Sequence, residues 1–236
     1  MSYLDTATGT VVSRASADER VGFIQKTFLH LAGAVAVFAL LESYLLSIGL
    51  GEKFMMFLSQ SKWMWLGVLV AYGAASMVAD KWARDDYSPA MQYVGLGLYI
   101  AVFAIIISPM MHIASTYFPG VIENAALVTG ALVAGLSLVA FTTKKDFSFL
   151  GPILSIGFMI ALALIIGSMI FGFQLGMFFM AVMIAFAAAS VLYSLSNIIH
   201  VYRPDQHVAA SLSLFSSVGL LFWYVVQFLM SMAGDE

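Results

Sequence analysis

Cysteine is absent from this chain of 236 residues, and charged residues make up only 10% of it. Without cysteine, neither a disulfide framework nor a thiolate metal site can form. The ten lysines and arginines form no basic cluster, so nucleic acid is not a predicted partner. The first twenty residues also lack the basic start, apolar centre and small-residue cleavage site of a signal peptide.

Apolar residues are what the chain has in excess. They make up 62% of the sequence, whereas soluble domains have roughly 45 to 50%, and the mean hydropathy is +0.97. The sequence therefore predicts an all-α integral membrane protein. Its apolar runs reach the ~20 residues that a helix needs to cross a bilayer, and they predict seven spans. The expected spans are 22–48, 63–79, 91–112, 121–142 and 149–171, with two more within 186–230.

Three local signals refine these expectations. Ser16, followed by Asp18 and Glu19, is typical of a capped helix start. Pro109 lies late in the third span and is expected to kink or end that helix, because proline removes a backbone hydrogen bond. Residues 49–61 are expected to form a loop.

The basic residues predict the orientation in the membrane. If the spans alternate, eight basic residues lie on one side and two on the other, which places the N-terminus in the cytoplasm and the C-terminus outside. Residues 1–20 are then a cytosolic tail, and 21–236 form the membrane domain. The eight are Arg14, Arg20, Lys26, Lys81, Arg84, Lys144, Lys145 and Arg203, and the two are Lys53 and Lys62.

Polar residues recur in the last two spans, on either side of a short charged turn. If these spans pack as a hairpin, their hydroxyl and amide groups face each other at similar depth. Polar side chains in lipid turn toward the bundle interior or a wet cavity, which makes this seam a candidate functional site. Serines that merely permit close helix packing are the alternative. The residues are Ser194, Ser196, Asn197, Ser211, Ser213, Ser216 and Ser217.

A few ionisable residues lie in or near the spans. Glu42 is either a buried acid or, as we expect, an interfacial one that reaches lipid headgroups. Asp80 is either an acid of an ion pathway or an interfacial residue beside Lys81. His30 is expected to bond a neighbouring backbone carbonyl rather than act as a base. Because His30 and His112 are the only histidines in the spans and no catalytic motif is present, no enzymatic activity is predicted.

The charged turn holds His200, Arg203, Asp205 and His207. A flexible segment with a single carboxylate is a poor metal cage, so we interpret these as solvated polar residues. The histidines give this turn weak pH sensitivity, since imidazole titrates near neutral pH. No metal or cofactor is predicted for this turn.

Several segments resemble the Bax inhibitor family, the TMBIM proteins. ALVTGALVAGLSLVAFTTKKDFSFLGPIL, residues 126–154, resembles the family's fourth helix, basic turn and fifth helix. LYSLSNIIH, residues 192–200, resembles bacterial YccA-like members, and AASLSLFSSVGLLF resembles the last helix. ISPM, residues 107–110, lies where the family carries a Gly-Pro break. The resemblance extends from about Phe23 onward and implies six helices that surround a central C-terminal helix.

The resemblance also implies function. Members are associated with calcium leak, with pH-dependent gating and, in bacteria, with modulation of the membrane-anchored AAA protease FtsH. Ser194 and Ser217 occupy the two positions of the family's sensor aspartates. Paired carboxylates share a proton and respond to pH, whereas serine does neither and binds calcium feebly. We therefore expect a protease modulator in the bacterial plasma membrane. The alternative is a cation leak past Ser217, Ser194 and Asn197, with Asp80 or Glu42 as substitute acids.

Overall fold

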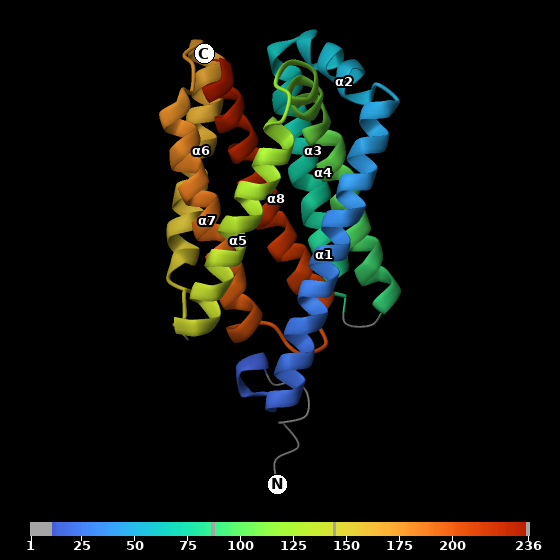
Figure 1. Ribbon diagram of the computed structural model, residues 1–236, viewed down its shortest axis with the longest axis vertical. Coiled ribbons are helices and arrows are strands. Elements are labelled where there is room, and N and C mark those ends of the chain that lie inside the picture. The colour runs from blue at the N-terminus through green and yellow to red at the C-terminus, as the bar shows by residue number, and fades with distance from the viewer. Residues whose placement is uncertain (1–10, 86–87, 144, 235–236) are drawn as a thin grey trace.

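The computed structural model describes residues 11–85, 88–143 and 145–234, and these residues are helical almost throughout (Figure 1). Seven of the helices are long and apolar enough to cross a membrane, which confirms the predicted number of spans. The elements are the 3₁₀ turn η1 (Val12–Arg14), α1 (Ala17–Ser47), α2 (Leu50–Ser59), α3 (Lys62–Ala83), α4 (Pro89–Tyr117), α5 (Val121–Thr143), α6 (Leu150–Phe171), α7 (Met177–His200) and α8 (His207–Gly234).

Helix α1 begins at Ala17, directly after a capping box at Ser16. The amide of Glu19 donates to the Ser16 hydroxyl at 3.3 Å, and the Glu19 carboxylate accepts from the Ser16 amide at 3.0 Å. This reciprocal capping box satisfies two backbone donors that a helix start otherwise leaves open. The predicted cap at Ser16 is thus confirmed.

The prediction of a loop at residues 49–61 was wrong, because this segment forms α2. Gly49 turns the chain with a φ of +70°, and the less exposed positions of α2 then recur at helical spacing, at Gly51, Phe54, Met55 and Leu58. A Cβ on Gly51 would lie 2.6 Å from the carbonyl oxygen of Ser108, so α2 packs directly on the backbone of α4. That contact gives the short helix a partner.

Of the two outcomes predicted for Pro109, a kink or an end of the helix, the end was wrong. α4 continues to Tyr117 although Pro109 has no N–H to offer the carbonyl of Ile105. The Ser108 hydroxyl donates to that carbonyl at 2.8 Å instead. Ser108 is completely buried, and such a side-chain partner lets a helix tolerate proline within a membrane.

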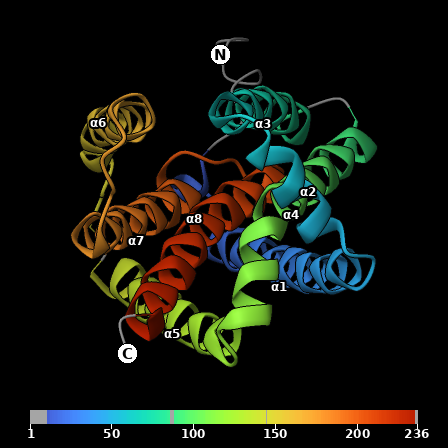
Figure 2. The same cartoon turned by 90° about the horizontal axis from the view of Figure 1, so that it is seen from above.

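Helix α8 is the centre of the bundle, as predicted (Figure 2). It packs against α1, α3, α4, α5 and α7. Helix α6 lies outermost and packs on α7, and it joins α8 in a small cluster of Ala161, Met183 and Tyr224. Half of the apolar stretch of α8 and 67% of that of α4 are buried, compared with 6% for α6. The candidate seam of polar residues lies where α7 packs on this central helix.

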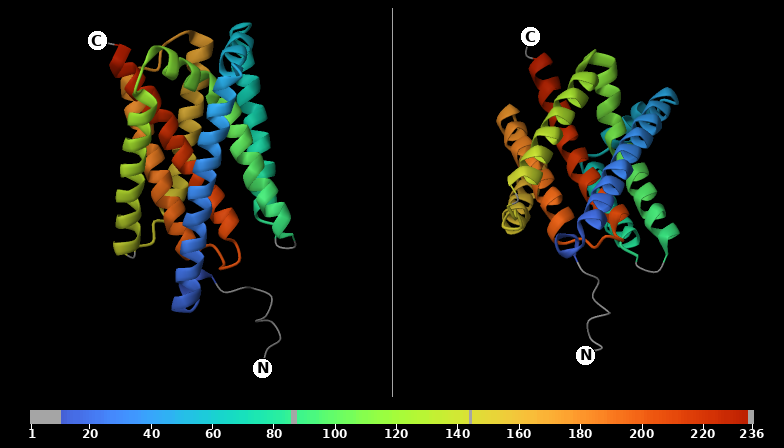
Figure 3. Two further views of the ribbon diagram at one scale, coloured as in Figure 1. Left: turned by 45° about the vertical axis from the view of Figure 1, so that its right-hand side comes forward. Right: turned by 60° about the horizontal axis from the view of Figure 1, so that its bottom comes forward.

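The two ends of the bundle differ in their basic residues. The start of α1, the end of α3, the α5–α6 connection and the α7–α8 turn lie at one end, which we call the basic end (Figures 1 and 3). Arg84, Lys145 and Arg203 belong to these segments, and Arg14 belongs to η1, which contacts the α7–α8 turn. The other end, which we call the α2 end, holds α2 with Lys53 and the last turn of α8.

Candidate functional site

The predicted contact between Ser194 and Ser217 is present at the centre of a hydroxyl cluster, which we call the serine seam. It consists of Ser190 and Ser194 of α7 and Ser213 and Ser217 of α8. The Ser194 and Ser217 hydroxyl oxygens are 2.8 Å apart, Ser190 is 3.0 Å from Ser217, and Ser194 is 3.4 Å from Ser213. Ser194 is only 3% exposed and Ser217 only 6%. Each seam hydroxyl is therefore hydrogen-bonded within the protein.

Asn197 stands apart from the serine seam. It is half-buried near the end of α7, and its backbone carbonyl accepts the amides of Val201 and Tyr202. Its side chain makes no hydrogen bond with the seam residues, all of which the structure describes. The seam as observed thus consists of hydroxyl groups alone and carries no ionisable side chain.

A second network of hydrogen bonds, which sequence reasoning missed, involves Ser216 and lies outside the serine seam. Tyr99 of α4 donates to the Ser216 hydroxyl at 2.7 Å, and the Tyr72 hydroxyl of α3 is 2.8 Å from that of Tyr99. Because Tyr99 uses its single proton on Ser216, Tyr72 donates to Tyr99. The sequence feature that could have indicated this network is a tyrosine in the middle of the second and of the third span, because a buried phenol needs a hydrogen-bond partner. The network joins α3, α4 and α8.

The expectation that Glu42 is interfacial was wrong. Glu42 is only 3% exposed, because the face of α1 that carries it packs into the bundle. Neither carboxyl oxygen has a hydrogen-bond partner among the described residues. The alternative reading of Glu42, a buried acid that faces the bundle, is the one that the structure supports.

Asp80 lies at the basic end, where it belongs to a link between α3 and the α7–α8 turn. Its carboxylate accepts from Nε of Arg84 at 2.9 Å, and both side chains are a little over 40% exposed. Nη2 of Arg84 donates to the Tyr202 hydroxyl at 3.1 Å, and the guanidinium carbon lies 5.3 Å from the centre of the Tyr202 ring. An exposed pair of this kind contributes little stability by itself. Its effect is to position Arg84 against the turn.

The four polar residues around the α7–α8 turn do not converge on one point. Asp205 pairs with Arg203, whose Nε lies 3.2 Å from the carboxylate, and this hydrogen bond is the main reason that the pKa of Asp205 is lowered. His207 lies instead against His30, with ring centres 4.8 Å apart. His200 turns toward Asp146 of the α5–α6 connection.

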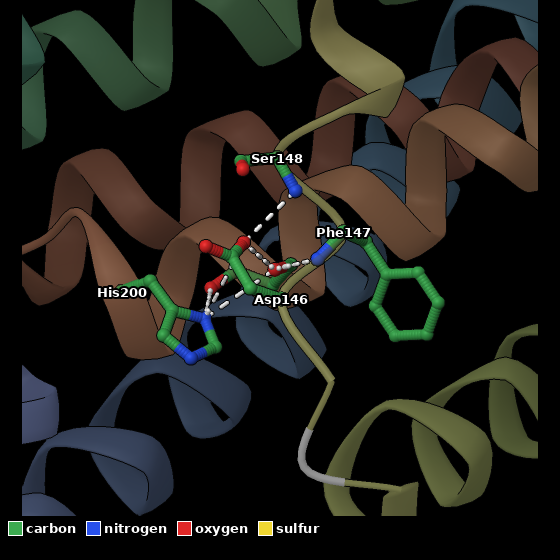
Figure 4. A network of polar contacts seen from close by, with 5 residues as sticks. Asp146, Phe147, Ser148 and His200 are labelled. Carbon is green, nitrogen blue, oxygen red and sulfur yellow. Dashed lines mark hydrogen bonds and ion pairs between the residues drawn. The ribbon is translucent and has the colours of Figure 1, made fainter.

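Asp146 fixes the α5–α6 connection to the end of α7 (Figure 4). Its Oδ1 accepts from the Ser148 amide at 2.9 Å and from the Ser196 hydroxyl at 3.3 Å, and it lies 4.0 Å from Nδ1 of His200. The Ser196 hydroxyl also accepts from the Phe147 amide at 2.9 Å. The hydrogen bond from Ser148 is the main cause of a lowered pKa at Asp146.

We expect Asp146→Asn to lower the unfolding temperature slightly at pH 7. A carboxyl whose folded pKa is lowered stabilises the fold above its unfolded pKa and loses this effect as pH falls through the folded pKa. The difference in unfolding temperature between Asp146→Asn and wild type should therefore shrink below about pH 4, near the ordinary pKa of aspartate. Thermal unfolding in detergent across this range checks it. A difference that persists at the lowest pH would contradict this role.

His30 makes the predicted bond to a backbone carbonyl and also one that was not predicted. Its Nδ1 lies 2.7 Å from the carbonyl oxygen of Lys26, and its Nε2 lies 3.0 Å from the Tyr93 hydroxyl. A carbonyl only accepts, so this pattern assigns the proton of the neutral ring to Nδ1 and leaves Nε2 to accept from Tyr93. Together with His207, these residues join α1, α4 and α8 at the basic end.

Comparison with known proteins agrees with this architecture. A family model described as Bax1-I, inhibitor of apoptosis-promoting Bax1, matches residues 20–234. Uncharacterized protein PA2604 of Pseudomonas aeruginosa is 34% identical over 119 residues, which cover 49% of this chain and 52% of that protein. The chain thus spans about half the length of this relative.

Two relatives from Neisseria meningitidis match over a longer stretch. Uncharacterized proteins NMA0420 of serogroup A and NMB2020 of serogroup B are each 23% identical over 181 residues, or 75% of this chain and 77% of theirs. The seven apolar helices and these bacterial relatives point to a multi-pass protein of the inner membrane. Since the family model covers nearly the whole chain, this protein belongs to the Bax1-I family of membrane proteins.

Proposed function

We propose that this protein acts by binding another membrane protein, as a modulator or partner of a membrane-anchored AAA protease such as FtsH in membrane-protein quality control. The observation that carries the proposal is the chemistry of the serine seam. At the two positions where the resemblance implies sensor aspartates, Ser194 and Ser217 bond each other at 2.8 Å. The serine seam is therefore neutral, and its hydroxyl groups bond one another.

A neutral seam is poorly suited to calcium or to pH gating. Ca²⁺ prefers several oxygen ligands with carboxylate charge among them, whereas the seam offers hydroxyls that already bond one another. Serine hydroxyls do not titrate near neutral pH, so the seam cannot sense protons as paired acids do. Its chemistry is that of a hydrogen-bonded helix contact, which suits a rigid binding module.

The basic end provides a surface for such a partner. The Val12 amide of η1 donates to the carbonyl of Tyr202 at 2.9 Å, and Val12 is completely buried. Tyr202 also receives Arg84, so η1, the end of α3 and the α7–α8 turn form one continuous face. The distribution of basic residues favours a cytosolic location for this face. In the sequence, residues 1–10 directly precede η1, which is docked on this face.

We expect full-length protein to capture the protease from solubilised bacterial membranes, and a variant that lacks residues 1–10 to capture much less. The deletion leaves the Val12 contact in place, so it tests the tail rather than the fold. Removal of residues 235 and 236, which follow α8 in the sequence, is the control and should not change capture. Equal capture by both truncated proteins would exclude residues 1–10 as part of the binding site. No capture by the full-length protein would overturn the proposal.

Calcium flux into dye-loaded liposomes separates this function from the alternative. At pH 6 and pH 8 we expect wild-type protein to show no flux above empty liposomes, because the seam lacks charged ligands. The alternative, a cation leak along α8 past Ser217, Ser194 and Asn197, is favoured by the buried acid Glu42. A clear flux at both pH values would support the leak, and Glu42→Gln and Asp80→Asn would then identify its acidic residues.

A further inference from the structure

Glu42 lies on the buried stripe of α1, which is otherwise almost entirely apolar. The stripe recurs every three or four residues and faces α4 and α8, the helices against which α1 chiefly packs. Glu42 is 3% exposed, so its carboxyl group is enclosed by protein rather than by lipid headgroups or water. The stripe consists of Phe23, Thr27, Leu31, Ala34, Phe38, Glu42 and Leu45.

No charged or donor group of the described residues compensates this carboxyl. The titratable side chains on the helices packed against this half of α1 are Glu52 and Lys53 of α2, His112 and Tyr117 of α4, and Tyr224 of α8. None of them donates to Glu42, whose two oxygens both lack partners. Lys53, the nearby cation in sequence, donates its Nζ to the carbonyl of Ile48 at 3.3 Å.

An ionised carboxylate in such a place would be very unfavourable. Moving an isolated charge from water into a medium of low dielectric costs far more free energy than moving the neutral acid. Here no hydrogen bond or cation among the described residues offsets this cost. A bound divalent cation would not offset the cost either, because the described residues place no group of three acids or histidines together. A proton is therefore the ligand that this site accommodates.

The surroundings separate Glu42 from the basic end. Phe38, one helical turn before Glu42, packs against Phe103 of α4 and against Phe215 and Phe222 of α8, with ring centres 5.4 to 6.5 Å apart. In the other direction, α1 ends at Ser47, which is about 8 Å farther along the axis at 1.5 Å per residue. The α2 end is thus the nearer aqueous side, and the aromatic cluster covers the opposite approach.

We propose that Glu42 is a proton-binding site of this membrane protein, a carboxyl group held in its neutral form between α1, α4 and α8. The site is separate from the serine seam, and it does not depend on the proposed protease partner. It adds a protonatable group to a bundle whose central seam has none, and it lies in the half of the bundle next to α2.

Labelling with dicyclohexylcarbodiimide tests this site, because this apolar reagent enters membranes and adds to carboxyl groups in their protonated form. With full-length protein in liposomes, peptide mass analysis should find the adduct on Glu42 at pH 7 and less of it at more alkaline pH. Glu42→Gln should reduce labelling to background. Glu123→Gln, which changes an exposed acid in the first turn of α5, is the matched control and should leave the Glu42 adduct unchanged.

Two further measurements test the neutral state of Glu42 without the labelling reagent. The infrared band of a protonated carboxyl carbonyl should be present in wild type at pH 7 and missing in Glu42→Gln. The same variant should unfold at the wild-type temperature at pH 7, because an amide closely imitates the neutral acid. Absence of both adduct and infrared band at pH 7, or an unfolding temperature that changes strongly in Glu42→Gln, would overturn the proposal.

Discussion

Replacing Ser194 and Ser217 together by aspartate should convert the serine seam into a pH-sensitive site. The two hydroxyl oxygens are 2.8 Å apart and both residues are buried, so the introduced carboxyl groups would be forced into contact. Two carboxylates at that separation cannot both ionise, and they would share one proton. The folded variant then retains a proton that the unfolded chain releases above about pH 4.

The expected sign follows from this retained proton. A folded state that binds more protons than the unfolded state loses stability as pH rises, so the double variant should be most stable in acid. Leaving an uncompensated charge in a buried pair costs about 3 to 5 kcal/mol, and we expect a loss of that order by pH 8. Wild-type protein, with hydroxyls at both positions, should show no corresponding loss.

Thermal unfolding and calcium flux at pH 6 and pH 8 measure the two consequences. The flux should depend on pH only in the double aspartate variant, since it alone carries the paired acids. Ser194→Ala with Ser217→Ala controls for the lost hydrogen bonds, because it removes the hydroxyls without adding charge. If the double aspartate variant folds but behaves alike at both pH values, then these positions are not equivalent to the family's sensor pair.

The number of spans could be predicted from sequence because the bilayer imposes a simple physical requirement. Each crossing needs an apolar run of about 20 residues, and such runs are visible without knowledge of what packs against them. The hairpin of α7 and α8 followed from the short charged turn between two such runs. Similar depth on neighbouring helices predicted that the polar residues of these spans face each other, and the resemblance to the Bax inhibitor family singled out Ser194 and Ser217, which are in contact.

The features that sequence did not reveal depend on tertiary contacts. Helix α2 is stabilised by the close approach of Gly51 to α4, and α4 passes Pro109 because Ser108 supplies a local hydroxyl. The burial of Glu42 was missed because α1 is apolar on nearly every side, so its periodicity does not show which face is inside. The pairing of His30 with His207 arises only when α1 and α8 pack together.

Gly95 and Gly97 show how strongly such contacts separate neighbouring positions, and they predict opposite outcomes for the same substitution. A Cβ on Gly95 would lie 2.6 Å from the carbonyl oxygen of Ala79 and 2.6 Å from the amide nitrogen of Ala83. Both atoms belong to the backbone of α3, so no side-chain rotation can relieve the clash. A Cβ on Gly97 would meet no atom within 4 Å.

We therefore expect Gly95→Ala to lower the unfolding free energy by roughly 3 kcal/mol, at the upper end of the usual cost of overpacking. Gly97→Ala should instead raise it by up to about 1 kcal/mol, because alanine favours the helix. Forcing α3 from α4 at Ala83 also moves the adjacent Arg84 away from Tyr202. Gly95→Ala should thus weaken capture of the proposed partner, while Gly97→Ala should preserve it. Equal unfolding free energies for the two variants, measured by denaturant titration, would mean that α3 and α4 approach less closely than the structure shows.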